Sequence, residues 1–202
     1  MVTATVYRLE AYTTLSPLEI RKNPVAGDRH FDLGAAFAII RRIMAEMEQQ
    51  EFTTEVAASV QQCFATITDF DVYPKWFSTV EKTRVLERYP NGLAKRVELR
   101  VDMKLKSIRY VLEYEYDKPT GLTWKQVDGD LEAIEGAYVF EKLGPKRTRV
   151  TCRQAVAMGF WVPGAFRKII ERQALKQSVL EFKAAAESAA KKAVSKRQKA
   201  KS

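Results

Sequence analysis

A run of alternating strands followed by one long helical segment constrains this chain more than any other feature of its sequence. The segments LAKRVELRVDMKL (93–105) and SIRYVLEYEYD (107–117) alternate apolar and polar side chains, which is typical of strands with one buried and one solvated face. From 163 to 190 the apolar spacing changes to the helical period, over a length of about 42 Å at 1.5 Å per residue. The helix and the apolar sheet face would bury each other if the helix lies across the sheet.

Turn signals and a cap complete this pattern. EFTTEVA (51–57) alternates as a first strand, and Ser59 is placed as the N-cap of a short helix. Further strands are separated by strong turn signals at Asn91-Gly92, Pro119-Thr120-Gly121, Asp128-Gly129 and Gly144-Pro145. We therefore expect an α+β fold in which a curved antiparallel sheet of about seven strands wraps a long C-terminal helix, with two short helices after the first strand.

The segment DFDVYPKWFSTV (69–80) is unusually aromatic. It is too irregular for one strand, and it carries too much apolar surface for an ordinary exposed loop. Two interpretations stay open. Its aromatic residues either cap an interior space or plug one end of the core, which is where apolar aromatic side chains usually lie.

The order of these elements resembles the START-like superfamily with its helix-grip fold, and within it the polyketide cyclase/dehydrase and coenzyme-Q-binding branch. The resemblance covers roughly residues 51–188. It implies a sheet that grips the helix around a hydrophobic tunnel for small apolar molecules, with 69–80 near the tunnel mouth. The matching residues are Ser59 through Asp69, Tyr73-Pro74, Trp76, Val85-Leu86-Glu87 and the stretch from Phe160 to Phe166.

The chain divides into three parts on this interpretation. Residues 51–187 form the START-like ligand-binding domain, and residues 188–202 form a basic C-terminal tail. Residues 1–50 are an N-terminal extension, either poorly ordered or not native. Met44 opens a segment that resembles a natural protein start, so our hypothesis is that residues 1–43 contribute nothing to function.

The positive charge of the chain is concentrated in its tail. Residues 188–202 contain six Lys or Arg and no acid, out of a net charge of +9, and residues 44–187 are almost neutral. The tail is either a solvated helix end, a weak contact for anionic membrane at about 1 kcal/mol per charge, or a nonspecific contact for RNA. Without interleaved aromatic residues it predicts no specific recognition of nucleic acid.

The sequence offers little for catalysis. His30 is the only histidine, so residues 44–202 cannot form a Ser-His-Asp or Cys-His arrangement. We expect no metal site and no cofactor, because histidine clusters, paired cysteines and phosphate-binding glycine motifs are missing. Glu113 and Glu115 should face solvent, whereas the face of Glu135 is ambiguous. Cys63 and Cys152 are two separated thiols, and no apolar run reaches the roughly 18 residues of a membrane span, which favours a soluble cytoplasmic protein.

The interior should be lined by a stripe of tyrosines, whose hydroxyls can orient a polar group of a ligand. Gln126 and Gln154 share the inner face and need a ligand, a water or the neighbouring backbone as partner. We assign no catalytic residue. The candidate ligand-binding residues are Trp76, Phe77, Leu99, Met103, Tyr110, Leu112, Tyr114, Trp124, Gln154, Phe160, Phe166 and Ile170.

These features predict noncatalytic binding or transport of a small hydrophobic molecule, such as a lipid, an isoprenoid quinone or an aromatic polyketide-like compound. Loops 70–78 and 158–165 would control access to it. The alternatives are a polyketide cyclase or dehydratase, and a ribosome- or RNA-associated protein that uses the basic tail. The sequence does not decide whether the protein is an enzyme, and it does not indicate the oligomeric state.

Overall fold

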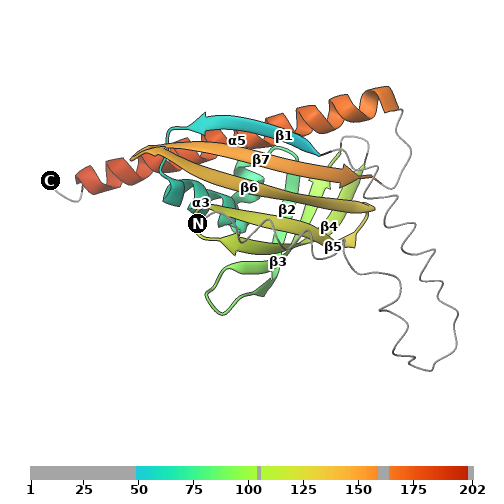
Figure 1. Ribbon diagram of the computed structural model, residues 1–202. Helices are drawn as coiled ribbons and strands as arrows, with labels where there is room; N and C mark the ends of the chain where they lie inside the picture. Colours follow the sequence, from blue (N-terminus) through green and yellow to red (C-terminus); the bar gives the residue numbers. More distant parts are fainter. Residues whose placement is uncertain (1–48, 104–105, 159–163, 200–202) are drawn as a thin grey trace, which may run out of the picture. The chain divides into compact units, whose positions relative to one another are not determined.

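The computed structural model describes residues 49–103, 106–158 and 164–199 (Figure 1). In the last helix it describes side chains from 172 to 193 and at 195. The N-terminal extension therefore lies almost wholly outside the described residues, as do His30 and the proposed start at Met44. Of the predicted loop 158–165, residues 159–163 lie outside the described residues.

Seven strands form one sheet in the order β1-β7-β6-β5-β4-β3-β2, and every neighbouring pair is antiparallel. The meander pairs successive strands, and β1 joins it by pairing with β7, as between Phe52 and Cys152. The predicted α+β helix-grip fold is confirmed. The strands are β1 Gln50–Val56, β2 Val80–Arg88, β3 Ala94–Asp102, β4 Ser107–Asp117, β5 Gly121–Gly129, β6 Ala133–Gly144 and β7 Arg147–Ala157.

Three short helices connect β1 to β2: α3 (Val60–Thr68), the 3-10 helix η2 (Phe70–Val72) and α4 (Tyr73–Trp76). Ser59 is the predicted N-cap of α3, and its hydroxyl accepts a hydrogen bond from the backbone N–H of Gln62. The Gln62 side chain bonds back to the Ser59 backbone, which completes a capping box. Pro74 fits the first turn of α4, where a missing N–H costs nothing.

The last helix, α5 (Gly164–Lys199), has 36 residues and is about 54 Å long at 1.5 Å per residue. It is longer than the predicted helix of 163–190 because residues 190–199 are mostly alanine, lysine, arginine and glutamine, which favour helix, with no glycine or proline to end it. It contacts β1, β7, α3 and α4. Among the described residues no helix is long and apolar enough to cross a membrane. The buried stripe of α5 consists of Leu175, Val179, Phe182 and Ala186.

The two ends of the sheet differ. At the end we call the loop-145 end, β6 turns into β7 and β1 leads into α3. Here Val56, Cys63 and Val150 are 0% exposed, and the buried Thr148 hydroxyl donates to the Ala58 carbonyl at 2.8 Å. These side chains are completely covered, whereas Val60 at the start of α3 keeps 7% exposure and Tyr116 is half-buried.

At the opposite end, which we call the loop-130 end, β5 turns into β6 through residues 130–132, β3 turns into β4, and β7 ends. Core side chains here keep residual exposure, from 7% for Ile134 to 9% for Tyr110. Met103 and Val156 are half-buried beside them. Several side chains of the interior face at the loop-130 end thus keep a small residual exposure, although Ile108 among them is 1% exposed.

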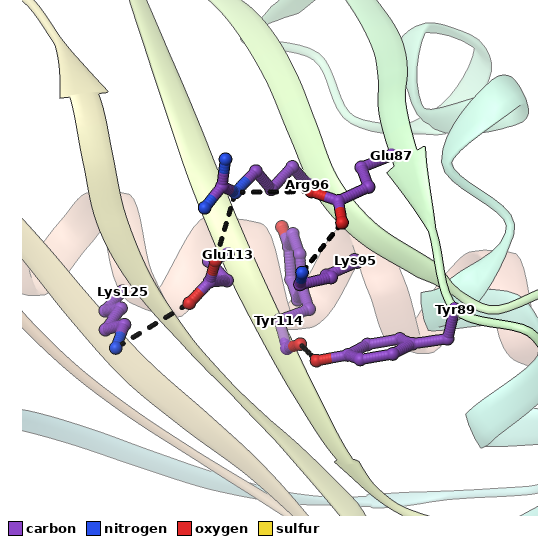
Figure 2. A network of polar contacts seen from close by, with 7 residues as sticks. All are labelled: Glu87, Tyr89, Lys95, Arg96, Glu113, Tyr114 and Lys125. Atoms are coloured by element: carbon purple, nitrogen blue, oxygen red, sulfur yellow. Dashed lines mark hydrogen bonds and ion pairs between the residues drawn. The ribbon is translucent and has the colours of Figure 1, made fainter.

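The other face of the sheet carries charged side chains in ion pairs (Figure 2). Glu113 is paired with Arg96 at 3.0 Å and with Lys125 at 3.7 Å, and Lys95 with Glu87 at 2.7 Å. The hydrogen bond from Lys95 lowers the pKa of Glu87. The alternation of β4 thus places its glutamates away from the tyrosines, as the sequence predicts.

Candidate ligand-binding site

The aromatic segment between α3 and β2 is divided in its role. Phe70 and Tyr73 are buried, and the Tyr73 hydroxyl donates to the Ile67 carbonyl at 2.6 Å. The ring of Phe70 lies 4.8 Å from that of Tyr114 on β4. These two side chains therefore belong to the core.

Trp76 and Phe77 lie farther out and are half-buried. The Trp76 ring contacts Tyr73 at 4.9 Å, Phe77 at 5.4 Å and Phe182 of α5 at 6.3 Å, measured between ring centroids. Trp76 therefore links the short helices to α5. The core-plug interpretation thus describes Phe70 and Tyr73, and the expectation that Trp76 and Phe77 cap an interior space stays a prediction.

The ring contacts continue across the sheet from α5. Phe182 lies 5.4 Å from Tyr138 on β6, and Tyr138 lies 5.6 Å from Trp124 on β5. Trp124 lies against the backbone of Gly136, its partner in the β5–β6 ladder, because a glycine leaves room for the indole there. These aromatic side chains form the middle of the interior.

Burial sets the chemistry of the tyrosines. Desolvation raises the pKa values of Tyr110, Tyr114 and Tyr138 well above the ordinary value of a phenol. At neutral pH they are uncharged hydroxyls. Tyr116, which the sequence places in the same stripe, lies toward the loop-145 end, where its hydroxyl donates to the Ala94 carbonyl at 2.6 Å.

Gln126 has one satisfied and one unsatisfied polar atom. Its Nε2 donates to the Leu131 carbonyl at 2.7 Å, a backbone partner of the kind the sequence allowed for. Its Oε1 is buried and has no hydrogen-bond partner. The only other buried side-chain atom without a partner in the described part of the chain is Nε1 of Trp76.

Cys63 and Cys152 are buried free thiols. Burial raises the pKa of Cys63 to about 11 and that of Cys152 to about 12. Since the thiolate is the reactive form, both are unreactive near neutral pH. Cys152 is a small core residue of the inner face, as predicted.

The glutamates considered from the sequence do not lie among the buried side chains of the inner face. The side chain of Glu135, whose face was ambiguous, is exposed, and so is that of Glu115. Within the described ranges no three His, Cys, Asp or Glu side chains gather as a metal site would require. The titratable groups of the described inner face are therefore phenols and thiols.

The structure brings most of the predicted ligand-binding residues into one cluster. Leu99, Tyr110, Leu112, Tyr114 and Trp124 are buried members of the core, and Trp76, Phe77 and Met103 pack against it. Gln154 is half-buried on β7 opposite Gly136. Phe160 lies outside the described residues, and Phe166 and Ile170 lie in the part of α5 without described side chains.

Several neighbours of this cluster were not predicted as site residues. Phe182 was visible on the apolar stripe of the last helix, but the length of the stripe gave no reason to choose it. Tyr138 lies in a strand with apolar residues on both faces, so the sequence could not assign its side. Gln126 was expected on the inner face with a ligand as one possible partner, but it was not among the candidate ligand-binding residues. The other members outside that candidate set are Tyr73, Leu131, Ile134, Tyr138, Val156, Met158 and Phe182.

With this geometry in place, comparison with known proteins identifies the family. The model of the family described as polyketide cyclase / dehydrase and lipid transport matches residues 56–183. The chain belongs to this family. The match begins at the end of β1 and ends inside α5, so it spans the sheet, the short helices and the buried stripe of α5. No curated protein matches the chain.

Solved structures share the fold of this family member. A START superfamily protein from Mycobacterium smegmatis is 23% identical, with a TM-score of 0.65, and the alignment covers 69% of this chain and 97% of that one. The Zhui aromatase/cyclase from Streptomyces sp. R1128 is 20% identical, with a TM-score of 0.60, covering 71% and 94%. At these identities the similarity establishes the helix-grip architecture.

Proposed function

We propose that the protein binds a small hydrophobic molecule between the inner face of the sheet and α5, toward the loop-130 end, and does no chemistry on it. The observation that carries the proposal is the contrast between the two ends of the core. At the loop-145 end Val56, Cys63 and Val150 are fully covered, and the buried Thr148 is hydrogen-bonded. Toward the loop-130 end the inner face keeps residual exposure.

The chemistry of this region fits an apolar ligand. Its walls are aliphatic and aromatic, and the polar groups among them are neutral phenols and amides. Family membership supports the same function, because the family is described by lipid transport as well as by cyclase activity. Binding would gain roughly 25 cal/mol for each Å² of apolar ligand surface removed from water.

The proposal is tested by titrating the protein with N-phenyl-1-naphthylamine, a neutral apolar dye that fluoresces when it leaves water. Ile134 and Val139 provide a matched pair on β6, because Ile134 is 7% exposed on the inner face and Val139 is 47% exposed on the outer face. Ile134→Trp should fill the inner side and weaken dye binding at least about tenfold, or 1.4 kcal/mol. Val139→Trp should leave it unchanged. Saturable binding that is equally strong in both variants would place the dye elsewhere and refute the proposal.

A cyclase or dehydratase is the second candidate, favoured by the family description and by the likeness to a protein named an aromatase/cyclase. Such chemistry needs a general acid or base with a pKa near the working pH. The tyrosines have pKa values raised by burial, which favours binding over catalysis. Turnover of a poly-β-ketone substrate that disappears in Tyr114→Phe would reverse this preference.

The basic tail, the cytoplasmic location and the coenzyme Q branch stay predictions. Lys191 and Lys192 are exposed near the end of α5, as expected either for a solvated helix end or for a contact with an anionic surface. Salt-sensitive cosedimentation with ribosomes or anionic vesicles, lost on deletion of residues 188–202, would support a contact.

A further inference from the structure

The orientation of the Gln126 amide is fixed by its surroundings. The Leu131 carbonyl can only accept a hydrogen bond, so the group 2.7 Å from it must be the NH₂ of the amide. Rotating the amide by 180° would bring two oxygens together and lose this bond. The carbonyl oxygen Oε1 is therefore held on the other side of the amide, buried and without a partner.

Gln126, a half-buried residue, lies next to the side chains of the proposed site. Gln126 lies on the inner face of β5, opposite Leu112 of β4 and two residues after Trp124. Leu112 and Trp124 are both buried in the core. A buried carbonyl oxygen without a donor is unfavourable, so the site favours an occupant that brings an N–H or O–H to Gln126.

The second atom without a partner is a donor. Nε1 of Trp76 is buried at the α4 side of the same core, with its ring against Tyr73, Phe77 and Phe182. An indole N–H can only donate, so it is matched by an oxygen of the occupant. The described part of the site thus has one unsatisfied acceptor and one unsatisfied donor, in addition to its neutral tyrosine hydroxyls and the Gln154 amide.

We propose that Gln126 is a specificity-determining residue that accepts a hydrogen bond from a hydroxyl of the ligand, so that the site selects hydroxylated apolar molecules such as phenols. A ligand oxygen that accepts from Trp76 completes the match. This inference rests on the proposed function. It distinguishes among the ligands considered above, because a quinone or an ester carries only acceptors and leaves Gln126 unsatisfied, whereas a hydroquinone or a phenolic polyketide satisfies it.

The test compares 2-naphthol with 2-methoxynaphthalene, which have the same ring system but differ in the donor. The affinities are measured by calorimetry or dye displacement and corrected for the water–octane partition of each probe. The wild-type protein should bind the naphthol about tenfold more tightly, which is the effect expected of one buried hydrogen bond. Gln126→Met keeps the length of the side chain and removes the acceptor. It should abolish the preference while leaving the affinity for 2-methoxynaphthalene unchanged or higher.

Gln61→Met is the control, because Gln61 is exposed on α3, and it should keep the preference. If the wild-type protein binds both probes equally, a resident water satisfies Gln126 and this inference is wrong, while the proposed function stands. If it binds neither probe nor the dye, both fail. A preference that persists in a folded Gln126→Met protein would assign the donor to another acceptor and overturn the role of Gln126.

Discussion

Replacing Gly136 by alanine should destabilise the protein more than a single methyl group suggests. A Cβ at this position would lie 2.5 Å from the Arg153 carbonyl oxygen and 2.6 Å from Cε2 of Trp124. Both distances are far inside van der Waals contact. Neither neighbour yields easily, because the carbonyl belongs to the β6–β7 ladder and the indole is packed on Tyr138 at 5.6 Å.

Overpacking of a well-filled core costs about 1–3 kcal/mol, and two rigid neighbours place Gly136→Ala at the upper end, about 2–3 kcal/mol. For a chain of this size each kcal/mol lowers the Tm by about 2–4 °C. The assay is urea unfolding followed by far-UV circular dichroism and by tryptophan fluorescence.

Gly144 offers the control in the same strand, because a Cβ there meets no atom within 4 Å. Gly144→Ala should be neutral, or it should stabilise the protein by up to about 1 kcal/mol because alanine lowers the conformational entropy of the unfolded chain. Adding Trp124→Leu to Gly136→Ala should recover only part of the loss, since the clash with the Arg153 carbonyl remains. Equal stability of the two alanine variants would refute the close packing of Trp124 on Gly136.

Three further predictions concern stability. Ser59→Ala removes the capping box of α3 and should lower the free energy of unfolding by about 1 kcal/mol, measured by urea unfolding; no change would contradict the cap. Thr148→Val leaves the Ala58 carbonyl without its donor and should cost about 1–3 kcal/mol in the same assay, whereas Thr148→Ser should cost less. The pKa values of Cys63 and Cys152 are raised to about 11 and 12. The contribution of the neutral thiols to the free energy of unfolding is therefore complete below the unfolded thiol pKa of about 8.5, and it is lost as the pH rises through the folded pKa values. Unfolding free energies at pH 8 and pH 10.5 should differ less in the Cys63→Ala/Cys152→Ala protein than in the wild type, and an equal difference would contradict the role of the thiols.

The sequence could predict those features that depend on local periodicity and caps. Alternation along β4 separates Glu113 from Tyr114 whatever the rest of the chain does, and Ser59 caps α3 through atoms three residues away. The extent of α5 was underestimated, because the change to lysine-rich composition after residue 188 suggested a separate tail, although lysine and alanine sustain a helix.

The arrangement of the site depends on contacts between distant strands, which periodicity does not reveal. Tyr110 and Tyr116 share a face, but six residues of strand separate them by about 20 Å, so they lie toward opposite ends of the sheet. The orientation of Gln126 depends on a carbonyl across the β5–β6 turn, and the seat of Trp124 depends on a glycine in the next strand. Each requires the register of the sheet to be known first.

The pairing of β1 with β7 has a consequence for folding during synthesis. Phe52 emerges from the ribosome a hundred residues before Cys152, its partner across the ladder. The β1 segment therefore has no strand to pair with until β7 has been synthesised. The inner face of the sheet stays uncovered until α5, with Val179 and Phe182, has been synthesised as well. Long-range closure of this kind slows folding, so the nascent chain passes through a stage at which its apolar face is open to aggregation.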